Sequence, residues 1–178
     1  MDAWMDKDDR YGAVSRLIHW LGAVAVFSML AVGLYFSNLP RGDARDFWFG
    51  LHVSLGVLLF FLLFFRVTWR LMRGFPPAFA QPPALQRLTA AIQRGMLLAL
   101  GVLILTGPFI VWTLARPLEV FEWFALPSPL PKLRDLHETL ETAHVTAAYA
   151  LIGLVAVHVL AALGHALKGD GAGRRMWG

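Results

Sequence analysis

Histidine is the residue type through which this sequence could do chemistry, because the chain has six histidines and no cysteine. The absence of cysteine excludes disulfides, iron–sulfur clusters, thiolate zinc sites and the thioether attachment of a c-type haem. Imidazole can bind a metal ion and can also accept or release a proton near neutral pH. The six candidates are His19, His52, His137, His144, His158 and His165.

Two of these histidines have a spacing that is informative in a helix. His144 and His158 are 14 residues apart within one stretch that lacks charged residues. In an α-helix this spacing separates two side chains by about 21 Å along the axis and by about 40° around it. One helix would therefore present two imidazoles on the same side, one near each face of a membrane.

The elements that must position the histidines are four stretches without Asp, Glu, Lys or Arg. A helix needs about 20 mostly apolar residues to cross the hydrocarbon core of a bilayer. Continuous apolarity favours spanning helices over the alternating strands of a membrane barrel. The stretches are residues 17–36, 47–65, 95–115 and 142–167. We therefore predict an all-α membrane protein, one domain over residues 1–178, folded as a four-helix up-down transmembrane bundle.

Charge predicts how this bundle is oriented in the lipid bilayer. An up-down arrangement places eleven of the sixteen basic residues on the side of both termini and five on the other side. Basic residues are retained on the cytoplasmic side, so both termini are predicted to be cytoplasmic. No run of basic residues alternates with aromatic residues, and nucleic acid is therefore not an expected partner.

In this bundle the histidines match in depth across helices, His19 with His158 near the inner face and His52 with His144 near the outer face. Paired imidazoles that face each other in an apolar bundle suit the two axial positions of a haem b iron. We therefore predict two bis-histidine haems b, with these four residues as the iron ligands.

Other residues near the ligands could hold the haem groups. Gly22 and Gly56 lie close in sequence to His19 and His52 and would leave room for a macrocycle. Arg66 and Arg70, four residues apart, can bind the propionates of the inner haem. The alternatives are ordinary helix packing for the glycines and membrane anchoring for the arginines. A haem-free transporter or scaffold, whose histidines bind a metal or a proton, is the alternative class.

Several motifs resemble the bacterial cytochrome b561 family over all four spans. They are residues 16–20 (RLIHW), residues 51–56 (LHVSLG), the exit of the second span over residues 66–71, and the spacing of His144 and His158. The resemblance implies a small dihaem protein of the bacterial inner membrane that has the same four ligands and exchanges electrons with quinone. It also implies superoxide oxidation on the periplasmic side, with superoxide or a redox protein as the electron donor.

The resulting hypothesis is a quinone-linked oxidoreductase that carries electrons across the bilayer. His165, seven residues beyond His158, is a candidate for proton exchange with quinone, and the alternative is an interfacial histidine without chemistry. His137 competes with His144 as a ligand, but its spacing to His158 would be about 31 Å, nearly the whole hydrocarbon thickness. The alternative function is a haem b membrane anchor that relays electrons for a separate soluble oxidoreductase.

Overall fold

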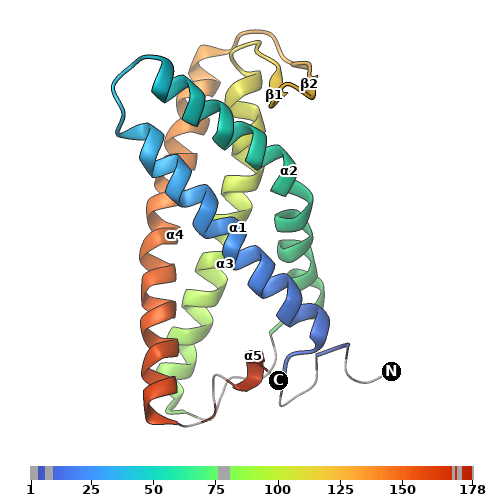
Figure 1. The fold of residues 1–178 in the computed structure, drawn as a ribbon. Helices are drawn as coiled ribbons and strands as arrows, with labels where there is room; N and C mark the ends of the chain where they lie inside the picture. The colour runs from blue at the N-terminus through green and yellow to red at the C-terminus, as the bar shows by residue number, and fades with distance from the viewer. Residues whose placement is uncertain (1–3, 7–9, 76–80, 170, 172–173, 178) are drawn as a thin grey trace.

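Four long helices form the molecule, which the computed structural model describes over residues 4–6, 10–75, 81–169, 171 and 174–177. All four helices are long and apolar enough to cross a membrane. Both termini lie at the lower end of the bundle in Figure 1. The helices are α1 (Ala13–Ser37), α2 (Asp43–Arg73), α3 (Pro83–Trp112) and α4 (Arg134–Lys168). The predicted four-helix membrane fold is confirmed; the side of the membrane that holds the termini stays a prediction.

Each helix begins before the charge-free stretch that predicted it, and α3 ends at Trp112, three residues before the end of its stretch. α3 begins at Pro83 rather than near residue 95, and α4 begins at Arg134 rather than near residue 142. A helix that leaves the hydrocarbon core no longer needs apolar residues, and proline is favoured in a first helical turn. α4 ends where Gly169 adopts a left-handed conformation, with φ of 65°. The first charged residue therefore indicates where a helix leaves the lipid. The helix itself ends further on, at a capping residue such as Gly169.

A small β-hairpin, which the sequence did not predict, lies at one side of the upper end of the bundle in Figure 1. Strand β1 (Leu118–Val120) pairs antiparallel with β2 (Phe124–Leu126). The Ser54 hydroxyl of α2 accepts a hydrogen bond from the Phe121 amide at 2.9 Å and donates one to the Glu119 carbonyl at 3.2 Å. Val120 is completely buried. The hairpin is thus anchored on α2 only two residues from His52.

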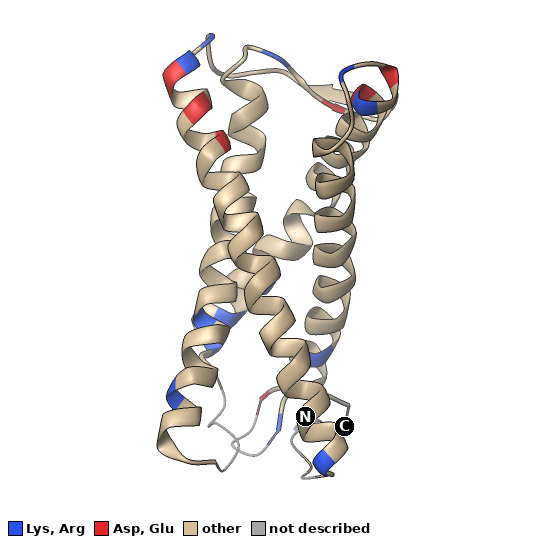
Figure 2. Cartoon of the chain, turned by 90° about the vertical axis from the view of Figure 1, so that its left-hand side faces the viewer, with Lys and Arg blue, Asp and Glu red and all other residues tan. Residues whose placement is uncertain are grey.

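The helices associate mainly as two antiparallel pairs, α1 with α2 and α3 with α4, which α2 and α3 join. Their shared core contains Ala25, Leu63, Leu100 and Ile104. Figure 2 shows Lys, Arg, Asp and Glu toward the two ends of the bundle, with an uncharged middle. A short helix, α5 (Arg174–Trp177), lies near the lower end.

Candidate functional site

The structure brings the four depth-matched histidines together as two pairs. His19 of α1 faces His158 of α4, with ring centroids 6.3 Å apart and ring planes at 66°. His52 of α2 faces His144 of α4, with ring centroids 6.4 Å apart and ring planes at 81°. We call His19–His158 the lower pair, because it lies toward the end of the bundle that holds the termini, and His52–His144 the upper pair.

The spacing of the rings fits one metal ion between each pair. A metal–imidazole nitrogen bond of about 2.0 Å, plus about 1.1 Å from that nitrogen to its ring centre, separates two collinear ligand rings by about 6.2 Å. Among the described residues, no group of three or more His, Cys, Asp or Glu side chains could hold a metal ion. Each pair therefore offers two ligands only, and haem iron, whose porphyrin supplies the other four, is the metal that such a site fits.

A threonine of α3 holds the His144 ring of the upper pair. The Oγ1 of Thr106 lies 2.8 Å from the Nδ1 of His144 and 2.7 Å from the Val102 carbonyl oxygen. Thr106 is buried. No sequence pattern marked Thr106 as a neighbour of His144, because the contact depends on the register of α3 against α4.

The other ring of the upper pair packs between apolar groups. Phe36 of α1 lies edge-on to His52, with ring centroids 5.4 Å apart. The Nδ1 of His52 is buried and has no hydrogen bond of ordinary geometry among the described residues. A Cβ atom at Gly33 would come within 3.2 Å of the Cε1 of His52. Gly33 therefore lies against a predicted ligand, a contact that no sequence pattern indicated.

The two glycines that the sequence placed at the haem sites contact other side chains. A Cβ at Gly22 would come within 2.7 Å of the Cδ of Arg66, and a Cβ at Gly56 would come within 3.4 Å of the Cε of Met29. Gly22 thus makes room for Arg66 beside the lower pair. Gly56 allows α1 and α2 to approach each other. Their contact with a macrocycle stays a prediction.

A half-buried arginine of α2 lies beside the lower pair. The Nη1 of Arg66 donates a hydrogen bond to the Ile18 carbonyl at 3.1 Å, and its Nη2 lies 3.4 Å from the Nδ1 of His19. One turn further along α2, the Trp69 indole donates to the Ser15 hydroxyl at 2.8 Å. These contacts fix α1 against α2 where the lower pair forms, and they place a positive charge next to His19.

The second predicted propionate partner, Arg70, is engaged by the N-terminal segment. Its guanidinium forms an ion pair with Asp6 at 3.1 Å, and both side chains are largely buried. It also donates to the Gly74 carbonyl at 2.7 Å and lies 5.2 Å from the centre of the Tyr11 ring. Burial raises the pKa of Tyr11, so that ring stays neutral beside the arginine. The role of Arg70 in holding haem stays a prediction.

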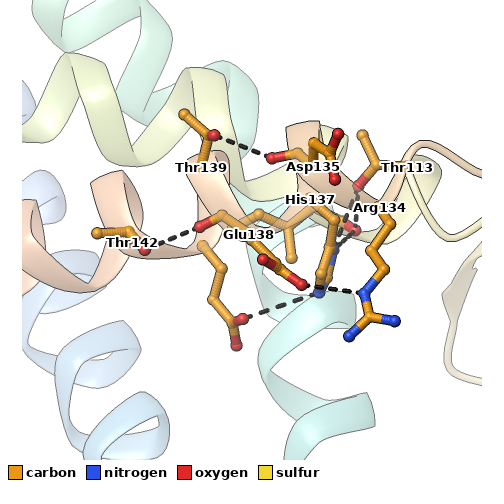
Figure 3. Close-up of polar contacts among 9 residues, drawn as sticks. Thr113, Arg134, Asp135, His137, Glu138, Thr139 and Thr142 are labelled. Carbon is orange, nitrogen blue, oxygen red and sulfur yellow. Dashed lines mark hydrogen bonds and ion pairs between the residues drawn. The ribbon is translucent and has the colours of Figure 1, made fainter.

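The two remaining histidines lie outside the pairs. His137 is in the first turns of α4, where its Nδ1 is 3.0 Å from the Ile110 carbonyl and 3.3 Å from the Thr113 hydroxyl (Figure 3). Its Nε2 lies 3.8 Å from Glu141. His165 lies in the last turn of α4. Among the described residues, neither of these rings contacts a ring of the upper or lower pair. The role of His165 in proton exchange stays a prediction, as does the choice of His144 over His137 as a ligand.

The fold and the two pairs define a class of protein, a multi-pass membrane protein with histidine pairs suited to axial ligation of haem. Residues 10–178 match the model of the prokaryotic cytochrome b561 family, and the chain belongs to that family. It is 31% identical over 168 residues to cytochrome b561 homolog 2 of Escherichia coli (strain K12), covering 92% of this chain and 88% of that protein. The family identifies a membrane b-type cytochrome that binds haem b and functions in electron transfer.

Proposed function

We propose that this cytochrome binds two haems b, one at each histidine pair, and carries electrons across the bilayer in exchange with quinone. The observation that supports two haems is the presence of two facing histidine pairs, each with ring centroids 6.3–6.4 Å apart, at two depths of α4. Their α4 ligands are 14 residues apart, about 21 Å along the axis, so the sites lie toward opposite faces of the membrane.

When bound, haem b supplies the one-electron chemistry, and the protein supplies the ligands, the orientation and the electrostatic environment. His19 and His158 would hold the lower haem, and His52 and His144 the upper one. The apolar helices around them exclude water, which limits side reactions. The two pairs differ in the charge of their neighbouring residues, and this difference is the protein's contribution to the direction of electron flow.

Arg66 has a specific role in this proposal. A guanidinium only donates hydrogen bonds, so its contact at 3.4 Å presents a donor to the Nδ1 of His19. Coordination of iron through Nε2 requires the proton on Nδ1, and Arg66 must then turn away from the ring. The carboxylates of a haem propionate are suitable new acceptors for a guanidinium. We therefore propose Arg66 as the principal propionate partner of the lower haem.

The distribution of charge supports the orientation. We propose that the lower end faces the cytoplasm of a bacterial inner membrane, because eleven of the sixteen basic residues belong to that side. The opposite side has five basic and seven acidic residues, and its net charge gives no attraction to the superoxide anion. The distribution of charge therefore supports quinone exchange at the lower, basic end. His165 is a candidate proton carrier there.

The decisive experiment measures haem content and reduction of the purified full-length protein. We expect two haems b per chain in a pyridine haemochrome assay, and reduction of both by a ubiquinol or menaquinol analogue in detergent. One haem per chain would contradict the two-site proposal. Two haems that no quinol reduces, and that no quinone oxidises, would contradict quinone exchange.

The electron donor is tested with the same preparation reconstituted in vesicles that contain quinone. Superoxide generated outside the vesicles and a reduced soluble redox protein are compared as donors. Superoxide-dependent quinone reduction, abolished by superoxide dismutase, would support superoxide as the outer substrate. Quinone reduction only with a co-purified protein subunit would instead support the membrane-anchor alternative.

A further inference from the structure

The hydroxyl of Thr106 joins α3 to the upper pair through a chain of two short contacts. Its Oγ1 is 2.7 Å from the Val102 carbonyl oxygen, one helical turn earlier, and 2.8 Å from the Nδ1 of His144. Thr106 is 8% exposed, so water does not compete for these contacts. Among the described residues, no other side chain forms a hydrogen bond with the His144 ring.

The chemistry of these three groups fixes the direction of both hydrogen bonds. A hydroxyl has one proton to donate and a carbonyl can only accept, so Thr106 donates to Val102. The hydroxyl oxygen then has only lone pairs to offer to the imidazole. The Nδ1 of His144 must therefore donate, which leaves the Nε2 of that ring with its lone pair free.

We propose that Thr106 is a positioning residue that holds His144 in the tautomer and orientation required to bind iron through Nε2. This inference rests on the proposed function, in which His144 is an axial ligand of the upper haem. A partner that accepts from the second ring nitrogen of a ligating histidine fixes the ring and raises its basicity. Thr106 thereby strengthens the bond from His144 to iron without touching the metal.

The antiparallel register of α3 and α4 places a similar threonine–histidine contact two turns away, which supplies a control, although there the His137 Nδ1 also lies 3.0 Å from the Ile110 carbonyl. Thr113 lies seven residues after Thr106, and His137 lies seven residues before His144. The Thr113 hydroxyl is 2.9 Å from the Ile110 carbonyl and 3.3 Å from the Nδ1 of His137 (Figure 3). Both threonines therefore bridge α3 to a histidine of α4, but only the first histidine belongs to a pair.

The effect on the upper haem follows from ligand basicity. A more basic imidazole donates more electron density and stabilises ferric over ferrous iron. Thr106→Val keeps the shape of the side chain but removes the acceptor, and the Nδ1 of His144 is left without this partner. We expect the midpoint potential of the upper haem to rise. We also expect the haem to be lost from the protein about tenfold faster, the scale seen when a ligating histidine loses its hydrogen-bond partner.

The test compares Thr106→Val, Thr106→Ser and Thr113→Val in the full-length haem-loaded protein. Each substitution is made in the native chain and in the His158→Ala background, which we expect to retain only the upper haem. Redox titration followed at the α band gives the potential, and transfer of haem to apomyoglobin gives the rate of loss. If Thr106→Val does not accumulate in membranes, Thr106→Ala replaces it in the same measurements.

We expect Thr106→Val to raise the upper potential and accelerate haem loss, Thr106→Ser to restore both values, and Thr113→Val to change neither. Native values in Thr106→Val would overturn the inference, as would an equal change in Thr113→Val or a failure of serine to rescue. Native protein with one haem, or His144→Ala that retains two, would instead overturn the proposed function on which the inference rests.

Discussion

The upper and lower histidine pairs have nearly the same ring separation but very different neighbours. At the upper pair, a neutral hydroxyl of α3 contacts the α4 ligand, and a glycine and a phenylalanine of α1 pack on the α2 ligand. At the lower pair, the guanidinium of Arg66 lies 3.4 Å from the α1 ligand. α4 supplies one histidine to each pair, so the contrast arises from the helices that face it.

This contrast has consequences for both binding and redox potential. In the proposed sites, His144 has its Nε2 lone pair free for iron, whereas Arg66 would have to move before His19 could bind iron through Nε2. A partly buried positive charge such as that of Arg66 would also stabilise the reduced form of a nearby haem, which carries less positive charge. We therefore expect the lower haem to have the higher potential, which favours electron flow from the upper end to the lower end.

Removal of one histidine ligand should produce the largest effect. It also tests whether the upper and lower pairs bind haem independently of each other. His158→Ala should abolish the lower haem and His144→Ala the upper one, each reducing the haem-to-protein ratio from two to one. The remaining haem should keep its own midpoint potential, as measured by optical redox titration. His137→Ala is the matched control on the same helix and should retain both haems.

Loss of both haems in either ligand variant would show that the sites assemble together. Retention of two haems in His144→Ala but not in His137→Ala,His144→Ala would assign the upper ligand to His137 instead.

Removal of the charge beside the lower pair should produce the next largest effect. Arg66→Leu should lower the potential of the lower haem and weaken its retention about tenfold, because a cation and a propionate partner are lost together. Arg66→Lys keeps the charge and should preserve most of the potential. Arg73→Leu is the control, since that arginine lies over the Trp69 ring, 5.6 Å from its centre, near the end of the same helix. An equal fall in the upper potential would contradict a local effect.

The sequence predicted the two pairs and an arginine near the lower one, but not the side chains that contact the upper pair. The rise and rotation of a helix are regular, so the depths of His144 and His158 followed from their numbers alone. Which α3 side chain meets His144 depends on helix register, and the contact of Thr106 was therefore missed. Arg70 is held by Asp6 of the N-terminal segment, a long-range ion pair that no local pattern indicates.

Spans were predicted well because lipid constrains composition, whereas the upper hairpin has strands of three residues each, too short for a periodic pattern. Val120 and Ser54 acquire their roles only when α2 and the loop after α3 pack together. The sequence therefore predicted the membrane-spanning helices, whose composition is constrained by lipid. It did not predict the hairpin, whose formation depends on tertiary contacts with α2.

Crowding of the upper pair should produce a smaller and more local effect. In Gly33→Ala the new Cβ would lie 3.2 Å from the Cε1 of His52, so the ring must shift by a few tenths of an ångström. We expect the upper haem to be lost a few-fold faster, with the lower haem unchanged, in the apomyoglobin transfer assay. Gly101→Ala is the control, because its Cβ would have no described atom within 4 Å.

The control should be neutral or slightly stabilising, since alanine is favoured over glycine in a helix by about 1 kcal/mol. Equal haem loss in Gly101→Ala would mean that the helices respond generally to added volume and that Gly33 has no special relation to His52.

We expect the smallest effect from a substitution at the hairpin. This substitution tests whether contacts around the upper pair hold its ligands in position. Ser54→Ala removes two hydrogen bonds, from Phe121 and to Glu119, each worth about 1 kcal/mol. Because Ser54 is two residues from His52, a loosened hairpin should broaden the spectrum of the upper haem and lower the thermal midpoint of the protein by a few degrees. Ser28→Ala, at an exposed position of α1, is the control and should change neither. A lower thermal midpoint without any change at the upper haem would show that the hairpin stabilises the bundle but does not position His52.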